Sequence, residues 1–284
     1  SYTTQLHMNF KRYVHQRLRD PASSVVILAQ FVINAFFAGT LFWQLDDTVE
    51  YITNRAGVLF FSLTVIAFGA TFATSVNIME NRIVYIREHA VSTYRTSAFV
   101  ITYFVILAVM EVIWVLVYSS IMYFMVGLNQ DRWRFVYFLL ISFLTIFVSM
   151  SFGTAVITLF KTYEVGVVVG MLMLVIWFVL GGLFVNNETL PGFYKAIALT
   201  SFMKWSFEAL LVTNFEGMTF ECTPGATTTI ARECPVSWET ALEQLGFPGR
   251  TISNTLLKDC MILLGMGTLY TLLTYLNTKY RRFG

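Results

Sequence analysis

Long apolar segments separated by short polar stretches make up most of the chain after residue 22. Each has about 20 residues or more, the length that an α-helix needs to cross the hydrocarbon core of a bilayer. The ten-residue blocks of alternating polar and apolar positions that mark a membrane β-barrel are absent from the sequence. The pattern predicts an all-α membrane protein with six spans, at Ser23–Leu45, Gly57–Ile78, Ala98–Val126, Phe135–Phe160, Gly166–Val185 and Leu256–Asn277.

The first 21 residues are amphipathic rather than uniformly apolar. Their apolar members recur at helical spacing with basic residues between them: Leu6, Phe10, Tyr13 or Val14, and Leu18. A helix of this kind lies along the bilayer surface, with its basic face toward lipid phosphates or a cytoplasmic partner. We therefore divide the chain into an amphipathic connecting helix, residues 1–21, and a six-span transmembrane domain, residues 22–284.

Two longer polar intervals interrupt the apolar pattern. Residues 79–96, which include the run ENRIVYIREHAVSTYR, indicate a charged connection between the second and third spans. Residues 186–255 precede the last span and begin with two short amphipathic patterns, broken near Thr200 and Ser201. The Trp, Tyr and Lys residues of these patterns are typical of helices at a membrane interface. Residues 222–254 are rich in Pro, Gly and Thr and indicate a small cap.

Composition agrees with a membrane protein, and the basic residues give it an orientation. The chain is 56% hydrophobic and only 13% charged, whereas a soluble domain carries roughly 25% charged residues. Lysine and arginine concentrate on the cytoplasmic side of membrane proteins. The short loops of one side hold only Arg55, Arg132 and Arg134. The other side holds Lys11, Arg12, Arg17, Arg19, Arg82, Arg87, Arg95, Lys161, Lys279, Arg281 and Arg282. This asymmetry predicts cytoplasmic termini, a cytoplasmic 79–96 connection and an external segment 186–255.

The predicted external segment contains two cysteines and a glycosylation sequon. Cys222 and Cys234 enclose a short loop with a Pro-Gly turn, and no histidine accompanies them. In an oxidising compartment this favours a disulfide over a metal site. Asn187 begins an Asn-Glu-Thr acceptor sequence, and its position very near the membrane leaves its occupancy open. Cys260 lies within the last span and is expected to be an inert packing residue.

Few residues could carry chemistry within the spans. The sequence has no G-x-x-x-x-G-K-S/T phosphate loop, and its three histidines are unclustered, which argues against a metal site. Glu111 lies within the third span, and Lys258 and Asp259 lie near the outer end of the sixth. An intramembrane carboxylate is a functional candidate, although a structural role is favoured for Glu111. A proton-coupled carrier needs several such residues, so we expect the energy for any transport to come from elsewhere.

One face of the second predicted span combines hydroxyl groups with an aromatic ring. Thr64, Phe68, Thr71 and Ser75 follow helical spacing and share this face. Hydroxyls inside a bundle hydrogen-bond to a neighbouring helix or to a ligand, and the sequence favours neither interpretation. Small residues of the fifth predicted span permit close helix approach: Gly166, Gly170, Gly181 and Gly182. The GxxxG spacing among them is common in membrane spans and is weak evidence for a dimer.

Five short stretches carry a resemblance to a known family: NRAGVLFF (54–61), the charged connection with IREH and TYR (86–95), YFMVGL (123–128), GGLFVN (181–186) and KDCMIL (258–263). They resemble the membrane domain of the G subfamily of ATP-binding cassette transporters. That subfamily includes the breast-cancer-resistance multidrug exporter, sterol half-transporters and the White pigment transporters. The resemblance covers essentially the whole chain. It implies that an ATP-binding domain precedes this domain on the same polypeptide, that this chain is an excerpt, and that two half-transporters dimerise.

The resemblance also implies roles for matching residues. Residues 79–96 resemble the elbow that receives motion from the ATPase, and the candidate coupling residues are Arg12, Glu80, Arg87 and Glu88. Phe68 matches a phenylalanine that clamps flat substrates across the dimer axis. Val175 and Phe178 match cavity-lining positions, beside Thr64 and Thr71 of the polar face. Leu183 and Phe184 match an apolar plug that separates an inner cavity from an outer one.

The chain departs from the multidrug exporter at two places. That exporter has a third cysteine in the outer loop that bridges the subunits, whereas this loop has only Cys222 and Cys234. A bridge between subunits is therefore in doubt, and the bridge within the loop remains expected. Val65 replaces a polar asparagine of the exporter, so the exporter's substrate range is not carried over.

We therefore expect the transmembrane half of an ATP-driven exporter that moves lipids, sterols or other amphipathic small molecules from the cytoplasmic side outward, by alternating access at a dimer interface. We expect the plasma membrane rather than an internal membrane. The expected partners are the nucleotide-binding ATPase domain, a second half-transporter, membrane lipids and the substrate. ATP and Mg are expected on the missing domain, and no cofactor, metal or nucleic acid is expected for this chain, which is not expected to be an enzyme by itself. The alternatives are an ATP-independent lipid scramblase or channel, or the membrane subunit of a polymer or carbohydrate exporter.

Overall fold

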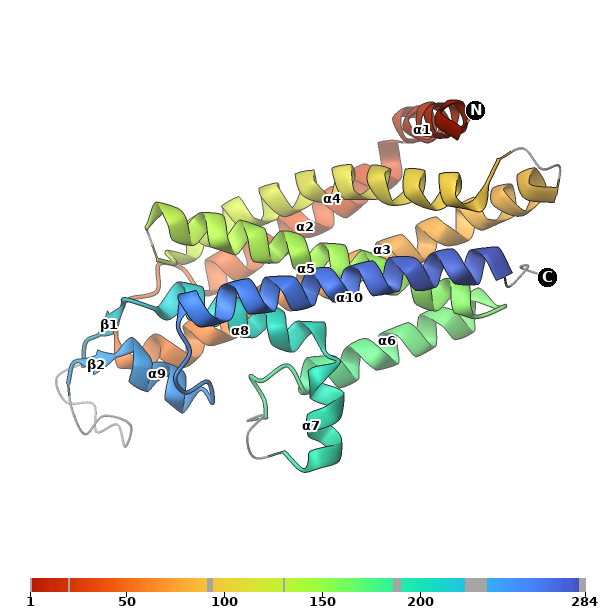
Figure 1. Ribbon diagram of the computed structural model, residues 1–284. Helices are drawn as coiled ribbons and strands as arrows, with labels where there is room; N and C mark the ends of the chain where they lie inside the picture. Colours follow the sequence, from red (N-terminus) through yellow and green to blue (C-terminus); the bar gives the residue numbers. More distant parts are fainter. Residues whose placement is uncertain are drawn as a thin grey trace.

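Long helices run side by side along the molecule, and shorter elements gather toward one end (Figure 1). The computed structural model describes residues 2–19, 21–90, 94–129, 131–185, 190–222 and 234–280. Within them the elements are α1 (Tyr2–Arg19), α2 (Pro21–Leu41), the 3₁₀ helix η1 (Val49–Tyr51), α3 (Ile52–Ala90), α4 (Thr96–Val126), α5 (Arg132–Leu159), α6 (Tyr163–Val179), α7 (Gly192–Leu199), α8 (Phe202–Phe215), β1 (Thr219–Phe220), β2 (Val236–Ser237), α9 (Trp238–Gln244) and α10 (Ile252–Tyr280). The prediction of an all-α membrane fold is confirmed.

Five of the described helices, α2, α3, α4, α5 and α10, are long and apolar enough to cross a membrane. They correspond to five of the six predicted spans, although α2 ends at Leu41, before the predicted end at Leu45. Local signals set some of their ends. The side chain of Asp131 caps α5 by accepting a hydrogen bond from the backbone N–H of Trp133. Gly127, with a φ of 69°, ends α4 in the left-handed conformation that glycine adopts without strain.

The remaining predicted span, Gly166–Val185, is shorter in the structure. Its helix, α6, has 17 residues and ends at Val179, at the lower limit of what crosses a bilayer. The chain turns at Leu180, and Gly182 takes a φ of 104°, a conformation that side chains disfavour. The predicted end at Val185 is therefore wrong. The sequence stays apolar past the turn, so composition does not show where the helix ends. The backbone at Gly181 and Gly182 shows it.

The segment before the last span folds back into the bundle. α7 and α8 meet at an angle of 77°, and the break at Thr200 and Ser201 confirms the predicted one. Ser201 caps α8 by accepting a hydrogen bond from the backbone N–H of Lys204. α7 is mostly exposed, but nearly every residue of α8 is buried. The expected interfacial position is therefore wrong for α8, whose Trp and Phe rings pack against protein.

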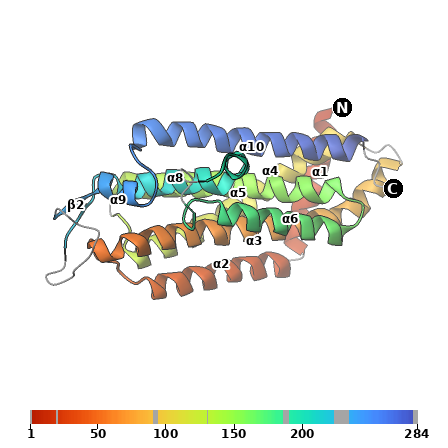
Figure 2. The ribbon, with the colours of Figure 1, turned by 90° about the horizontal axis from the view of Figure 1, so that it is seen from below.

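α5 lies at the centre of the bundle and packs against α3, α4, α6, α8 and α10 (Figure 2). Gly153 lets α3 approach closely, because a Cβ there would lie 2.8 Å from the carbonyl oxygen of Thr71. Hydroxyl groups join other pairs of helices. Thr145 Oγ1 of α5 donates a hydrogen bond to Ser206 Oγ of α8 at 2.8 Å. Small residues and hydroxyls thus connect the helices, as expected where lipid surrounds the bundle.

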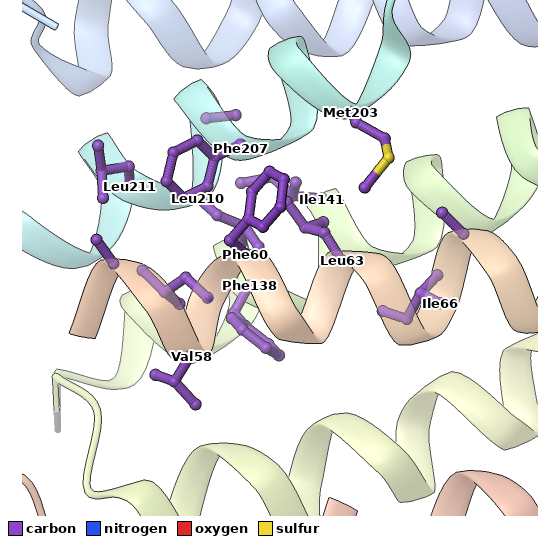
Figure 3. Packing of buried hydrophobic residues seen from close by; sticks show 14 of the residues in the cluster. Val58, Phe60, Leu63, Ile66, Phe138, Ile141, Met203, Phe207, Leu210 and Leu211 are labelled. Carbon is purple, nitrogen blue, oxygen red and sulfur yellow. The ribbon is translucent and has the colours of Figure 1, made fainter. Parts of the chain in front are cut away.

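The main group of buried apolar side chains fills the space where α3, α5 and α8 meet (Figure 3). Phe60 and Leu63 come from α3, Ile141 from α5, and Phe207 and Leu210 from α8. All five are almost completely buried. α8 is therefore part of the core and does not merely connect the last two spans.

The two ends of the bundle differ. α1, the end of α3, the start of α4 and the end of α10 lie at one end, and β1, β2 and α9 lie at the other (Figures 1 and 2). β1 and β2 pair in antiparallel fashion, with Thr219 opposite Ser237. Next to this pair, Cys222 and Cys234 form a disulfide with their Cα atoms 6.1 Å apart. The predicted disulfide is confirmed.

Candidate functional site

Five phenylalanine rings from separate parts of the chain meet at the edge of the core: Phe60 and Phe68 of α3, Phe178 of α6, Phe184 after α6, and Phe207 of α8. We call these residues the aromatic cluster. The ring centroid of Phe178 lies 5.2 Å from that of Phe60 and 5.0 Å from that of Phe184. It lies 6.4 Å from the centroid of Phe68. The ring of the predicted cavity residue Phe178 thus meets both the predicted cavity residue Phe68 and the predicted plug residue Phe184.

Phe60 lies at the centre of the aromatic cluster, and sequence reasoning gave it no role. Its ring meets those of Phe207 and Phe184 edge-to-face, at centroid distances of 5.1 and 5.8 Å. Gly181 permits this packing, because a Cβ there would lie 2.6 Å from Cε2 of Phe60. Both residues belong to stretches that carry the family resemblance, NRAGVLFF and GGLFVN. These two stretches could have suggested that Phe60 and Gly181 act together, but the contact between them forms only in the folded chain.

The aromatic cluster has a buried side and an open side. Phe60 and Phe207 are buried, whereas 59% of Phe184 is exposed. Phe68 is partly exposed, and so is the predicted plug residue Leu183. Val175 is 49% exposed one turn before Phe178 on α6, so it extends the same open side. Aromatic rings with exposed edges and faces can stack on a flat apolar molecule.

The hydroxyls of the predicted polar face have two different environments. Thr71 is buried, and its Oγ1 donates a hydrogen bond to the carbonyl oxygen of Ser149 in α5 at 3.2 Å. Ser75 is also buried, and its Oγ donates to the carbonyl oxygen of Thr71 at 2.7 Å. Thr64 is partly exposed, although its Oγ1 donates to the carbonyl oxygen of Phe60. Burial favours a packing role for Thr71 and Ser75, and the bond from Thr71 to α5 corrects its placement among the cavity residues.

The two glycines of the GxxxG pattern in α6 lie against α5. A Cβ on Gly166 would lie 2.9 Å from Cδ1 of Ile157, and a Cβ on Gly170 would lie 3.6 Å from Cγ1 of Val156. Close approach between helices of one chain therefore accounts for this pattern. It supplies no argument for a contact between two copies.

At the end of the bundle that carries the termini, an ion pair joins α1 to α3. The guanidinium of Arg12 contacts the carboxylate of Glu88, and the hydroxyl of Tyr94 donates a hydrogen bond to the other oxygen of Glu88 at 2.7 Å. The guanidinium also lies 5.1 Å from the ring centroid of Tyr13 and 5.9 Å from that of Tyr94. We call Arg12, Glu88 and Tyr94 the α1–α3 joint. It unites two of the four predicted coupling residues with a tyrosine that sequence reasoning did not single out.

Charge in the α1–α3 joint is stabilised by these contacts. Burial disfavours the charged form of Arg12, but hydrogen bonds with Glu88 and Tyr94 outweigh that effect and raise the pKa of Arg12. Burial is also the main reason why the pKa of Tyr94 is raised, and its hydrogen bond with Glu88 adds to the effect. At neutral pH the joint therefore contains a charged guanidinium and a neutral phenol whose O–H donates a hydrogen bond to Glu88.

The other two predicted coupling residues, Glu80 and Arg87, are exposed on α3. The stretch predicted as a connection, 79–96, is mostly helix, because α3 continues to Ala90 without interruption. Glu80 and Arg87 are seven positions apart and share one helical face. The four predicted coupling residues thus divide into one pair that binds α1 to α3 and another pair that faces away from the chain.

The remaining candidates lie elsewhere. Glu111 is 1% exposed, and neither of its carboxylate oxygens is hydrogen-bonded within the part of the chain that the structure describes. Cys260 is buried and free, in agreement with a packing role. Asn187 lies outside the described residues.

A cavity of about 400 Å³ near the α4–α5 turn is lined by Gln44, Tyr123, Phe124, Gly127, Leu128, Asp131, Arg132 and Phe135. It contains none of the predicted cavity residues, so the candidate substrate surface is the open side of the aromatic cluster.

Comparison with known proteins agrees with this arrangement. Residues 4–215 match the family described as ABC-2 type transporter. ABC transporter G family member 24 of Dictyostelium discoideum is 30% identical over 286 aligned positions, which cover 99% of this chain and 24% of that protein. The ABC transporter ATP-binding protein/permease wht-1 of Caenorhabditis elegans is 27% identical over 286 positions, or 100% of this chain and 42% of that protein. The chain spans less than half the length of these relatives. It belongs to the ABC-2 type transporter family and is a membrane domain of the ABC G type.

Proposed function

We propose that this chain is the membrane half of an ATP-driven exporter of lipids, sterols or other amphipathic small molecules. The observation that carries the proposal is the open side of the aromatic cluster, in a membrane domain of the ABC G type. Phe68, Phe178 and Phe184 present rings from two neighbouring segments, and Val175 adds apolar surface beside them. A surface of this kind suits a flat apolar cargo, because it offers stacking contacts and few polar groups.

A second half-transporter would complete the site. In a two-fold dimer the same patch of both copies meets, so the two open sides would form the walls of a slit with a Phe68 on each. Cargo would enter the slit from the cytoplasm or the inner leaflet. Leu183 and Phe184 would close the slit toward the outside. The plasma membrane is the proposed location.

Energy would reach the slit through the α1–α3 joint. The sequence contains no phosphate-binding loop, so an ATPase domain that binds ATP and Mg is the proposed partner. α3 is a single helix of 39 residues that carries Glu88 near one end and Phe68 and Phe60 farther along. A displacement of the joint would therefore move the rings. Transport also requires the cluster to hold cargo more tightly in the inward state than in the outward state, because equal affinity shifts no equilibrium.

Transport by the full-length protein in liposomes tests the proposal. ATP-dependent uptake would be measured for dehydroergosterol, a fluorescent phosphatidylcholine and rhodamine 123. We expect Phe68→Ala and Phe178→Ala to lower uptake of the transported compound at least five-fold and to remove its stimulation of ATP hydrolysis. Phe193→Ala is the matched control, because it makes the same change at a ring of α7 that is 72% exposed and outside the aromatic cluster.

Two other results would contradict the proposal. Movement of the fluorescent lipid in both directions without ATP would identify a scramblase. ATP hydrolysis that responds neither to any compound of the panel nor to Phe68→Ala would remove the support for a cargo site at the aromatic cluster.

A further inference from the structure

Two carboxylates are buried where α8 meets α10. The side chain of Glu208, in α8, is 1% exposed, and that of Asp259, in α10, is 0% exposed. Neither oxygen of Asp259 is hydrogen-bonded within the described residues. Burying a carboxylate inside a membrane bundle costs free energy. Such a residue is therefore a candidate for a functional role unless a structural ion pair explains it. The function proposed above does not use either residue.

Basic side chains surround these carboxylates from the solvent side. Nε of Arg250 lies 3.0 Å from Oε1 of Glu208. Nζ of Lys258 lies 3.9 Å from the same oxygen and 3.9 Å from Oδ1 of Asp259. Arg250 and Lys258 are 40% and 42% exposed, so each cation keeps contact with solvent while it pairs with a buried acid. We call Glu208, Arg250, Lys258 and Asp259 the α8–α10 ion cluster.

The ring of Trp205 adds a second contact between the two helices. Nζ of Lys258 lies 4.8 Å from the ring centroid, and Nζ of Lys204 lies 4.7 Å from it. The indole N–H of Trp205 donates a hydrogen bond to the carbonyl oxygen of Leu199 at 3.0 Å. Trp205 therefore ties the ion cluster to the bend between α7 and α8.

A different face of α8 packs against the aromatic cluster. Phe207 directly precedes Glu208, and consecutive residues on a helix point about 100° apart. Glu208 therefore meets cations at α10 while the ring of Phe207 meets Phe60 of α3 at a centroid distance of 5.1 Å. The start of α8 also holds α6, because Ser201 Oγ donates a hydrogen bond to the carbonyl oxygen of Trp177. α8 thus contacts the ion cluster through Glu208. It contacts the two helices that carry the aromatic cluster, α3 and α6, through Phe207 and Ser201.

We propose that Glu208 is a positioning residue for the aromatic cluster. Its ion pairs with Arg250 and Lys258 hold α8 against α10, and this position presses Phe207 onto Phe60 and keeps the rings of Phe178 and Phe184 together. Apolar side chains could join two helices without burying charge. An ion pair differs from such an apolar contact, because it forms only when both charged partners are in place. One of these partners, Arg250, lies on the segment before α10. The inference rests on the proposed slit that the rings close, but not on the identity of its cargo.

The test measures leakage of carboxyfluorescein from liposomes that contain the full-length protein, without ATP. Glu208→Gln keeps the shape of the side chain and removes its charge. We expect leakage to rise at least five-fold, because the rings no longer close the path. Glu208→Asp keeps the charge and should return leakage to within two-fold of the unmodified protein. Glu243→Gln is the matched control, since it makes the same change at an exposed residue of α9.

A second readout separates positioning from general destabilisation. Arg250→Gln removes the partner instead of the acid and should raise leakage as Glu208→Gln does, whereas a variant that merely unfolds would lose ATP hydrolysis and elute as aggregate. Unchanged leakage in both variants, with the proteins folded, would overturn the inference. Leakage that Glu208→Asp fails to restore would also overturn it. Carboxyfluorescein leakage requires no cargo, so failure here is distinguishable from failure of the proposed lipid and sterol transport.

Discussion

Two ion-paired groups, the α1–α3 joint and the α8–α10 ion cluster, lie in different parts of the bundle and differ in their access to water. In the joint, Arg12 and Glu88 are 34% and 29% exposed. In the ion cluster, the acids Glu208 and Asp259 are 1% and 0% exposed, and only their cations reach solvent. The same chemistry therefore serves one contact in which both partners are partly exposed and one in which the acid is buried.

The difference in burial predicts a difference in purpose. A partly exposed ion pair contributes about 1 kcal/mol or less to stability, so it can open and close during a transport cycle. Removing one partner of a buried pair costs about 3–5 kcal/mol, because the other charge is left without compensation. The α1–α3 joint therefore suits a moving contact near the proposed ATPase, and the α8–α10 ion cluster suits a fixed one beside the aromatic cluster. Four experiments can break or sharpen this distinction.

The largest effect is expected from reversing one charge in each group. Glu208→Lys places a buried ammonium beside Arg250 and Lys258 and should lower the apparent Tm of the detergent-purified full-length protein by on the order of 10 °C. Glu88→Lys leaves two partly exposed cations that water can separate and should lower it by about 2 °C or less. Intrinsic tryptophan fluorescence during heating measures both. Equal losses of stability would show that the two groups do not differ.

The next effect concerns transport rather than stability. Arg12→Glu and Glu88→Arg should each lower ATP-driven uptake about ten-fold, which corresponds to about 1.4 kcal/mol of lost coupling. The double variant restores opposite charges across α1 and α3 and should recover uptake to within about three-fold. A double variant as inactive as either single one would mean that the ion pair does not transmit motion.

A smaller effect is expected from Tyr94→Phe. The change removes the hydrogen bond to Glu88 but keeps the ring beside Arg12. Uptake per ATP hydrolysed should fall about three-fold, or about 0.7 kcal/mol, within the range for a single hydrogen bond. Tyr194→Phe is a suitable control, because its ring is half-exposed on α7. Identical behaviour of the two variants would exclude a role for the Tyr94 hydroxyl.

The smallest effect is the dependence on salt. Raising NaCl from 0.1 to 1 M shortens the screening length from about 10 to about 3 Å and weakens exposed charge pairs first. The difference in Tm between the unmodified protein and Glu88→Gln should shrink toward zero over this range. The corresponding difference for Glu208→Gln should change by about 1 °C or less, since solvent ions do not reach the buried oxygen. The opposite ranking would contradict the assignment of the fixed and the moving contact.

Several elements of the fold followed from local pattern. The five longest apolar helices, the break at Thr200 and Ser201, and the Cys222–Cys234 disulfide all match their predictions. Each depends on composition or turn chemistry within a short stretch, such as apolar length, a capping serine or a Pro-Gly turn. Residues 79–90 were missed as helix because their charge indicates solvent contact, and a helix that extends beyond the bilayer has the same composition as a loop there.

The candidate site was less accessible to sequence reasoning. Phe68 and Phe178 were expected to line the cavity and Phe184 to belong to the plug, and the ring of Phe178 meets both of the others. Phe60 was missed, because a phenylalanine in an apolar span has many apolar neighbours and nothing in its spacing marks it as central. Thr71 was placed beside Phe68 by helical periodicity, yet its hydroxyl bonds to α5. Periodicity gives the face of a helix but does not identify which neighbour covers that face.

The sequence by itself determined that this is a helical membrane domain, where most of its helices lie, and which two cysteines pair, because these properties depend on the length and composition of single segments. Only the tertiary structure decided that α8 enters the core, that Phe60 links the predicted cavity to the predicted plug, and that Glu208 meets Arg250 and Lys258. Those contacts join residues that are far apart in the sequence. The packing of Phe60 also depends on how close the backbones come, which Gly181 permits without any signal in its own neighbourhood that names the partner.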